Sequence, residues 1–435
     1  MEFYTKINKD SLNIQTIFIT ISIFFLIRYF MATPIERYYY IIDSILIVII
    51  GIYSTIIIFT KVHLKEKSFF YYVYFISIFY ILYSAFRAKT FFDQPIYLGI
   101  LAQRAYILLN TSLIAYYFIN ENKVTINNLI KIFKSIAWLS LVIYSIIYFF
   151  FKYIFIETKY LSYDPLLGYR FKFQIYLIIF ISFFHLFEYL EKSNILSLVK
   201  FIISIFFFMF VCKGRGLNIV MMITILVVIF KEIKKINKAV KLYLLITVII
   251  IGLFGYLYIK KDIVQVVVHR MSDIIMVLQE LESSDVSANA RLYQSKRIEE
   301  TWQKNSESLL LGVGFLSNYL IEGEKRGYDI FYGYLRPTDV GIKGVMFVYG
   351  IIGTIFVLII PTIIIFREII RNISNNDIFI KSSSYFLLYI LISSIYTGEI
   401  VFNPYFVYFI LGILKGIRDF KKNKLSSGYF SNKLR

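Results

Sequence analysis

The sequence predicts an all-α polytopic membrane protein of about twelve transmembrane helices, with a large, partly helical extracytoplasmic loop between spans nine and ten. Hydrophobic residues make up 58% of the 435 residues, and the mean hydropathy is +0.68. Apolar runs of about 20 residues, the length that crosses roughly 30 Å of hydrocarbon, recur between charged clusters. A single long polar interruption, from Lys260 to Asp339, follows the ninth run.

Nine predicted spans precede this interruption and three follow it. They are Ile14–Phe30, Tyr39–Thr60, Phe69–Phe86, Ile96–Ile119, Phe133–Phe151, Phe173–Leu190, Ile195–Val211, Leu217–Phe230, Leu242–Ile259, Ile342–Phe366, Ser384–Tyr396 and Tyr405–Leu414. The chain therefore divides into spans one to nine (1–259), the outer loop (260–341), spans ten to twelve (342–418) and a basic tail (419–435).

Lysine and arginine residues predict the orientation, because basic residues stay on the cytoplasmic side during insertion. Alternate short connections carry them, beginning with Lys61, Lys123, Lys192, Lys231 and Arg367. Both termini are thus predicted to be cytoplasmic, and the long loop faces outward. The net charge of +19 is assigned to this cytoplasmic rim, where it meets anionic membrane lipids, and we expect no nucleic-acid partner.

The long loop is predicted to fold. It has no proline before Pro337, and apolar residues between Ile263 and Leu281 recur at helical spacing. A second helix is predicted to begin after Ser287 and to end before Gly312. A folded outer domain in a membrane protein is a natural place for chemistry.

Several short motifs occur in and around this loop. Their sequences are Ser287-Ala-Asn-Ala-Arg291, Leu310-Leu311-Gly312-Val313-Gly314-Phe315, Thr338-Asp339-Val340-Gly341 and Tyr349-Gly350-Ile351-Ile352-Gly353. Tyr169-Arg170 and Lys213-Gly214-Arg215-Gly216 come earlier, each at a span boundary. In this order, and with twelve predicted spans, the chain resembles the O-antigen polymerase and ligase superfamily, and in particular the O-antigen and capsular polysaccharide polymerases.

The resemblance implies a metal-independent glycosyltransferase of the bacterial cytoplasmic membrane that needs no cofactor. Such an enzyme transfers glycan from polyprenyl pyrophosphate to a lipid-linked acceptor on the outer face. The partners it implies are the polyprenyl pyrophosphate-linked oligosaccharide and membrane lipids, with a chain-length regulator and a flippase as further candidates. An acceptor hydroxyl attacks the anomeric carbon while pyrophosphate leaves, so the site needs a base and cations.

Four arginines are candidates for binding the substrate. Arg170, Arg215 and Arg291 all fall on the predicted outer face, and arginine contacts phosphate in a bidentate manner. Arg104 lies near the middle of the fourth predicted span, where an unpaired charge is expensive, so we expect a function or an internal pair with an acid such as Glu399. Simple snorkelling to lipid headgroups is an equal alternative for Arg215, and it is the better explanation for Arg28.

Two acids are candidates for catalysis. Asp339 is the predicted base because it enters the tenth span at the membrane edge, and the alternative is a helix N-cap. Glu399, at the outer end of the eleventh predicted span, is the reserve candidate, and its alternative role is a salt bridge to an arginine. No metal is expected, since the histidines His63, His185 and His269 are scattered.

Two other functions remain open. Ligases of the superfamily typically have a histidine near the position of Asp339, which favours a polymerase for this chain. A flippase or transporter of lipid-linked oligosaccharide would also have about twelve spans with cations in its core. A large folded outer loop is unnecessary for transport, and this favours the enzyme.

Overall fold

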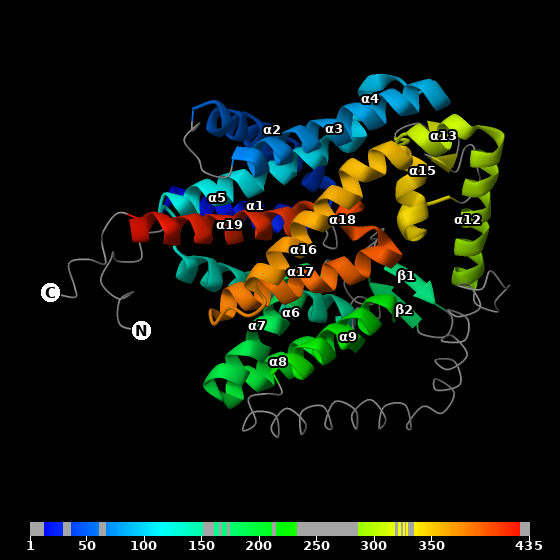
Figure 1. Ribbon diagram of the computed structural model, residues 1–435. Coiled ribbons are helices and arrows are strands. Elements are labelled where there is room, and N and C mark those ends of the chain that lie inside the picture. Colours follow the sequence, from blue (N-terminus) through cyan, green and yellow to red (C-terminus); the bar gives the residue numbers. More distant parts are fainter. Residues whose placement is uncertain are drawn as a thin grey trace.

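The computed structural model describes residues 13–28, 36–60, 67–150, 161–164, 168–171, 175–210, 215–232, 286–317, 321–322, 325–326, 328 and 335–426. These residues form a helical bundle with two short hairpins (Figure 1). The predicted ninth span and the predicted amphipathic helix between Ile263 and Leu281 lie outside the described residues.

The elements fall into two parts along the chain. The first part contains α1 (Ile14–Leu26), α2 (Glu36–Thr60), α3 (Lys67–Phe92), α4 (Ile96–Gln103), η3 (Arg104–Asn110), α5 (Thr111–Asn120), α6 (Ile126–Phe150), β1 (Leu161–Asp164), β2 (Gly168–Phe171), α7 (Tyr176–Lys192), α8 (Ile195–Phe210) and α9 (Arg215–Glu232). The second contains α12 (Val286–Lys304), α13 (Ser306–Leu311), β3 (Ile321–Glu322), β4 (Lys325–Arg326), η4 (Pro337–Asp339), α15 (Gly341–Thr354), η5 (Ile355–Ile359), α16 (Ile360–Asn372), α17 (Ile378–Thr397), α18 (Glu399–Phe402) and α19 (Tyr405–Ser426).

The prediction of a helical membrane protein is confirmed. Among the described residues, six helices are long and apolar enough to cross a membrane, namely Ile41–Thr60, Tyr71–Phe92, Ile96–Asn120, Ile126–Phe150, Gly341–Asn372 and Ile378–Ile395. The count of twelve spans stays a prediction. At the carboxyl end, α19 continues beyond the predicted end of the last span at Leu414 to Ser426, and so includes the first eight residues of the predicted tail.

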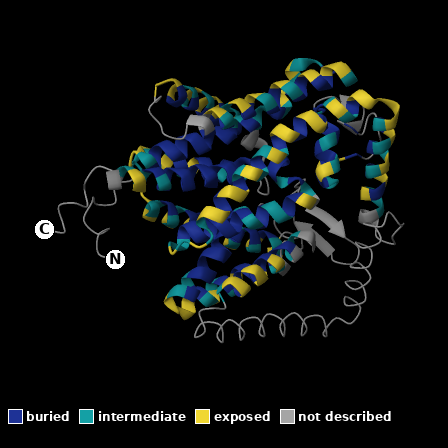
Figure 2. Cartoon of the chain, in the orientation of Figure 1, coloured by how far each residue is buried: buried dark blue, intermediate teal, exposed yellow. Residues whose placement is uncertain are grey.

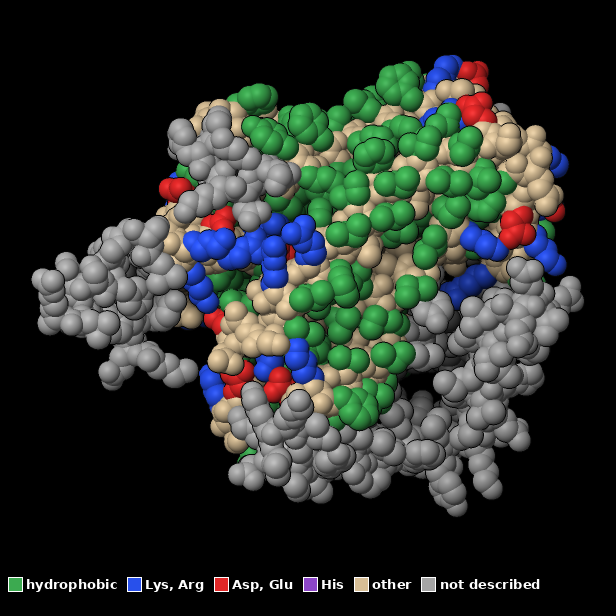
Figure 3. Space-filling model, in the orientation of Figure 1, with side chains coloured by type: hydrophobic (Ala, Val, Ile, Leu, Met, Phe, Trp, Pro, Cys, Tyr) green, Lys and Arg blue, Asp and Glu red, His purple; other side chains and the backbone are tan. Residues whose placement is uncertain are grey.

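The surface has the pattern of a membrane protein. Hydrophobic side chains cover the middle of the molecule, and charged side chains gather at its two ends (Figure 3). On α15, η5 and α16 the exposed hydrophobic residues include Ile351, Ile355, Ile359, Ile363 and Phe366. Large apolar areas of this kind are rare on soluble proteins, so this face is suited to contact lipid. The interior is also apolar, and its buried residues run through all the central helices (Figure 2).

Three of the long helices are interrupted. α4 passes into the 3-10 helix η3 at Arg104, α15 breaks at Gly350 (φ 67°), and α17 ends at Gly398 (φ 62°) before the short α18. Each break frees backbone polar groups, which must find other partners inside a membrane. The π-helix η5, which follows the break at Gly350, shows such partners. There Tyr72 Oη donates to the carbonyl oxygen of Phe356 and Tyr80 Oη donates to that of Val357, both at 3.1 Å.

The break at Gly350 brings two of the sequence motifs together. The amide nitrogens of Val313 and Gly314 donate to the carbonyl oxygens of Phe347 and Val348, at 2.9 and 3.0 Å. A Cβ atom on Gly350 would lie 2.3 Å from the carbonyl oxygen of Leu310. The glycines of both motifs are therefore explained by close backbone packing, which holds the segment around Gly312 on the bundle.

Candidate functional site

A polar cluster is built around Glu399 from residues far apart in the chain. We call it the Glu399 cluster, and its members are Arg28, Asp43, Arg104, Tyr176, Glu399, Asn403 and Tyr405. Glu399 lies just after the end of α17, and its Oε2 accepts hydrogen bonds from Tyr176 Oη and from Asn403 Nδ2, the latter at 3.2 Å. In the described part of the chain this carboxylate forms no ion pair, so the predicted alternative of a salt bridge does not apply there.

Arg28, at the end of α1, belongs to this cluster. Its Nη2 donates to Tyr405 Oη at 3.2 Å, and its guanidinium carbon lies 5.2 Å from the centre of the Tyr405 ring. The guanidinium also acts electrostatically on Glu399 and Asp43. The interpretation of Arg28 as a snorkelling side chain therefore missed its interior contacts.

Asp43 and Arg104 supply unsatisfied polar atoms. Asp43, on α2, is only 6% exposed, and its Oδ1 has no hydrogen-bond partner among the described residues. Arg104 Nη1 donates to the carbonyl oxygen of Leu101 at 2.7 Å, while its buried Nε has no partner in the same part of the chain. The acid on which the Arg104 charge acts is Asp43 rather than the expected Glu399. Buried polar atoms are almost always paired, so these two have capacity for a ligand or for water.

Asp339 and Arg291 lie on two packed segments. α12 is bound to the segment around α15: Gln294 Oε1 accepts from the amide of Arg336 at 2.7 Å, and Lys343 Nζ donates to Ser295 Oγ at 2.9 Å. Arg291 is one helical turn before Ser295, and Asp339 is four residues before Lys343. Both therefore flank the same contact between helices.

The side chains of Asp339 and Arg291 are available for binding. Arg291 is exposed and Asp339 is partly exposed, and neither forms a hydrogen bond or ion pair through its side chain among the described residues. α15 begins without a side-chain cap, so Asp339 does not serve as the N-cap that was its alternative role. A carboxylate and a guanidinium that are both open to a ligand suit proton and phosphate chemistry.

The segment with Asp339 also lies near the Glu399 cluster. η4 packs against α17, and a Cβ atom on Gly398 would lie 3.2 Å from Val345 Cγ2 on α15. Glu399 directly follows this glycine. Asp339 thus lies on an element that contacts α17, the helix that ends just before Glu399.

The other two predicted cations are placed by their backbones alone. Arg170 is on β2, paired with Ser162 across the hairpin, and Arg215 is the first residue of α9. In Figure 1 the hairpin lies toward the end of the bundle where α12 and α13 are found. No group of three or more histidine, cysteine, aspartate or glutamate residues capable of holding a metal occurs within the described residues.

Comparisons with protein-family models, with curated proteins and with solved structures found no match to this chain. The resemblance to the polymerase and ligase superfamily therefore depends on the motifs and on the helical architecture. The residues of the site have to be judged by their own geometry.

Proposed function

We propose that the protein is a glycosyltransferase that polymerises lipid-linked repeat units on the outer face of a bacterial cytoplasmic membrane. It has twelve spans and cytoplasmic termini, and it transfers glycan from polyprenyl pyrophosphate to a lipid-linked acceptor. One observation carries the proposal: α12, with Arg291, is bound beside the segment that holds Asp339. A cation and a base from distant motifs then flank one contact, and a glycosyl transfer from pyrophosphate requires both groups beside the substrate.

Each group has a definite role in the proposed reaction. Asp339 accepts the proton of the acceptor hydroxyl while that oxygen forms its bond to the anomeric carbon. The bond from the anomeric carbon to the pyrophosphate oxygen breaks, and the electron pair leaves with the pyrophosphate. Arg291, with Arg170 and Arg215, stabilises the growing negative charge. Glu399 and Arg104, together with Arg28, hold the side chains of the adjoining Glu399 cluster in place.

Transport of a lipid-linked oligosaccharide is the second candidate, and the interrupted helices favour it. Transporters commonly bind substrate where helices are broken near the middle of the membrane. In this chain η3, Gly350 and Gly398 interrupt apolar helices. The glycan products of intact cells separate this candidate from the enzyme.

The test is a surface-glycan gel of cells that lack this chain, together with extraction of their polyprenyl-linked glycans. A polymerase predicts single repeat units that still reach their final anchor. Long polymer stranded on the polyprenyl carrier would indicate a ligase instead. Single units trapped at the cytoplasmic face would indicate a flippase.

Complementation with variants tests the site. Asp339→Asn is expected to lower polymerisation by a factor of about 10²–10⁴, the usual contribution of a general base. Arg291→Ala is also expected to abolish long chains, whereas Lys296→Ala, an exposed lysine on the same helix, is the matched control. Normal polymer from Asp339→Asn and Arg291→Ala proteins, both verified in the membrane, would contradict the site.

A further inference from the structure

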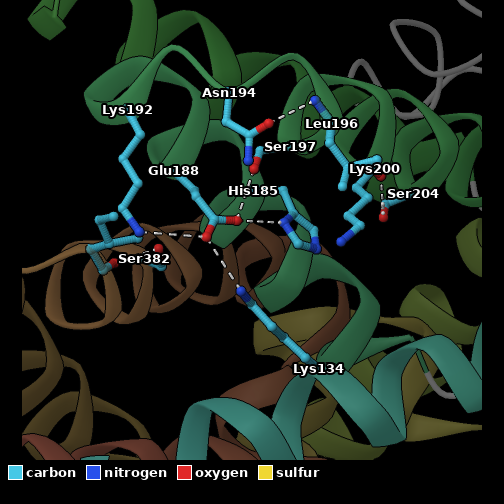
Figure 4. Close-up of polar contacts among 11 residues, drawn as sticks. Lys134, His185, Glu188, Lys192, Asn194, Leu196, Ser197, Lys200, Ser204 and Ser382 are labelled. Carbon is cyan, nitrogen blue, oxygen red and sulfur yellow. Dashed lines mark hydrogen bonds and ion pairs between the residues drawn. The ribbon is translucent and has the colours of Figure 1, made fainter. Parts of the chain in front are cut away.

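A second polar cluster lies where α6, α7 and α8 meet (Figure 4). We call it the Lys200 cluster, and its members are Lys134, His185, Glu188, Lys192 and Lys200. Glu188 Oε1 is 3.4 Å from Lys134 Nζ and 3.7 Å from Lys192 Nζ, while Oε2 is 3.2 Å from His185 Nδ1. Oε2 also accepts from Ser197 Oγ at 2.9 Å. Four groups therefore share both oxygens of this single carboxylate.

The positive charge of Lys200 is not paired with an acid in the part of the chain that the structure describes. Its ammonium forms no ion pair or hydrogen bond among the described residues, yet its positive charge acts on both His185 and Lys134. Figure 4 shows its side chain extending from α8 toward the imidazole. Three lysines around one partly buried carboxylate leave an excess of positive charge, and like charges repel strongly where water is scarce. A further anion would offset that repulsion.

His185 provides an independent sign of a missing ligand. The side chain is 0% exposed, its Nδ1 faces Glu188, and its Nε2 has no hydrogen-bond partner within the described ranges. A fully buried ring nitrogen without a partner is uncommon. A phosphate anion beside the ring would favour its doubly protonated form, in which Nδ1–H donates to Glu188 and Nε2–H donates to the anion.

The adjoining surface of α8 is apolar. Ile195, Val199, Ile203 and Phe206 recur at helical spacing and are 73%, 43%, 41% and 57% exposed. Lys200 directly follows Val199, so its cationic group lies at the edge of a face suited to acyl chains. A free phosphate ion would make no favourable contact with such an apolar face, whereas the acyl chains of a phospholipid would.

We propose that the Lys200 cluster binds the phosphate group of an anionic phospholipid. Lys200, Lys134 and His185 Nε2 hold the phosphate oxygens, and the acyl chains lie along the apolar face of α8. The connection between α7 and α8 is predicted to be cytoplasmic, the side on which anionic lipid attracts basic residues. This site is separate from the Glu399 cluster and does not depend on the proposed polymerase activity.

Trp138 makes the proposal measurable. The chain has two tryptophans, and the Trp138 ring centre lies 6.0 Å from that of His185. A full-length Trp302→Phe protein therefore reports on this site alone. In lipid nanodiscs, brominated phosphatidylglycerol is expected to quench Trp138 more strongly than brominated phosphatidylcholine at the same mole fraction.

Variants in the Trp302→Phe background test the cluster. Lys200→Gln is expected to lower the preference for the anionic lipid about fivefold, the effect of one lysine near a charged surface, and Lys200→Arg should keep it. The matched control is Lys421→Gln, which removes an exposed lysine from α19 and should leave the preference unchanged. Circular dichroism of each variant verifies the helical fold.

Three results would overturn the proposal, two from the lipid comparison and one from inorganic phosphate. The first is equal quenching by the two lipids, and the second is an equal loss of preference in Lys421→Gln, which would assign the effect to the diffuse charge of the rim. Inorganic phosphate separates the two sources of the same chemistry. If it displaces brominated phosphatidylglycerol, the cluster is a site for free phosphate rather than for lipid.

Discussion

The Glu399 cluster and a cluster around Glu368 both hold charged groups inside an apolar bundle, but they differ in how completely those groups are bonded. Glu368, on α16, is 1% exposed and faces three cations, with Arg371 Nη1 at 3.1 Å, Arg418 Nη1 at 2.9 Å and Lys415 Nζ at 3.6 Å. We call these four residues the Glu368 cluster. In the Glu399 cluster, by contrast, Asp43 Oδ1 and Arg104 Nε have no partner.

The difference distinguishes a structural role from a binding role. The cations of the Glu368 cluster come from α16 and α19, so their contacts with one buried acid tie these two helices together. Both oxygens of the Glu368 carboxylate are bonded to these cations, so this buried acid has no bonding capacity left for a ligand. The region near the Glu399 cluster is held instead by close backbone packing and tyrosine hydroxyls, which leaves some of its charged groups incompletely bonded.

The largest effect on stability is expected at Glu368. Glu368→Ala leaves three cations without their buried acid, and loss of one partner from a buried ion pair costs about 3–5 kcal/mol. Thermal unfolding in detergent micelles measures this loss. Polymer synthesis per folded molecule should stay at the level of the unmodified protein. An unchanged unfolding midpoint would contradict a structural role for the Glu368 cluster.

A smaller loss is expected at Gly350. A side chain there meets the carbonyl oxygen of Leu310 and must adopt a positive φ. Gly350→Ala should therefore cost about 3 kcal/mol, near the upper end for a strained residue. Limited proteolysis of the segment around α12 and α13 should accelerate in parallel. Gly51→Ala, whose new Cβ would lie 3.5 Å from Ile107, is the control without such a clash.

Tyr80 tests whether tyrosine hydroxyls replace ion pairs as structural contacts. Tyr80→Phe leaves the carbonyl of Val357 in the π-helix without its donor, which costs about 1–3 kcal/mol. The same unfolding assay measures it. An unchanged stability would mean that the π-helix does not need this bond. Tyrosine hydroxyls would then not take the structural role that ion pairs have in the Glu368 cluster.

The smallest effect is expected on the surface of α12. Arg297 Nη1 and Glu300 Oε2 are 3.1 Å apart, with side chains 41% and 48% exposed. Glu300→Gln should change stability by less than about 1 kcal/mol. A loss as large as that of Glu368→Ala would show that burial does not distinguish these ion pairs.

Much of the helical framework could be predicted from the sequence. The runs that lie in α2, α3 and α6 are apolar for the length of a span, and local hydrophobicity is enough to locate them. The breaks at Arg104 and Gly350 could not be located, because they depend on the packing of segments distant in sequence. Gly350, for instance, breaks α15 where the chain around Gly312 lies against it.

The site was predictable as single residues but not as pairs. A charge inside an apolar run is expensive, and this identified Arg104 as a candidate. Its electrostatic partner Asp43 and the Glu399 partner Tyr176 depend on how helices pack across the bundle. Arg28 and Asp43 are also charges inside apolar runs and carry the same free-energy cost, so the sequence pattern that identified Arg104 was present for both residues.

The most direct test of the comparison is a paired measurement on Glu399→Gln and Glu368→Ala proteins. For each, the unfolding midpoint in micelles and the length of polymer in complemented cells are compared with those of the unmodified protein. We expect Glu399→Gln to keep its stability and lose long polymer, and Glu368→Ala to lose stability and still make polymer. Normal polymer from a stable Glu399→Gln protein would show that the Glu399 cluster has no part in polymerisation.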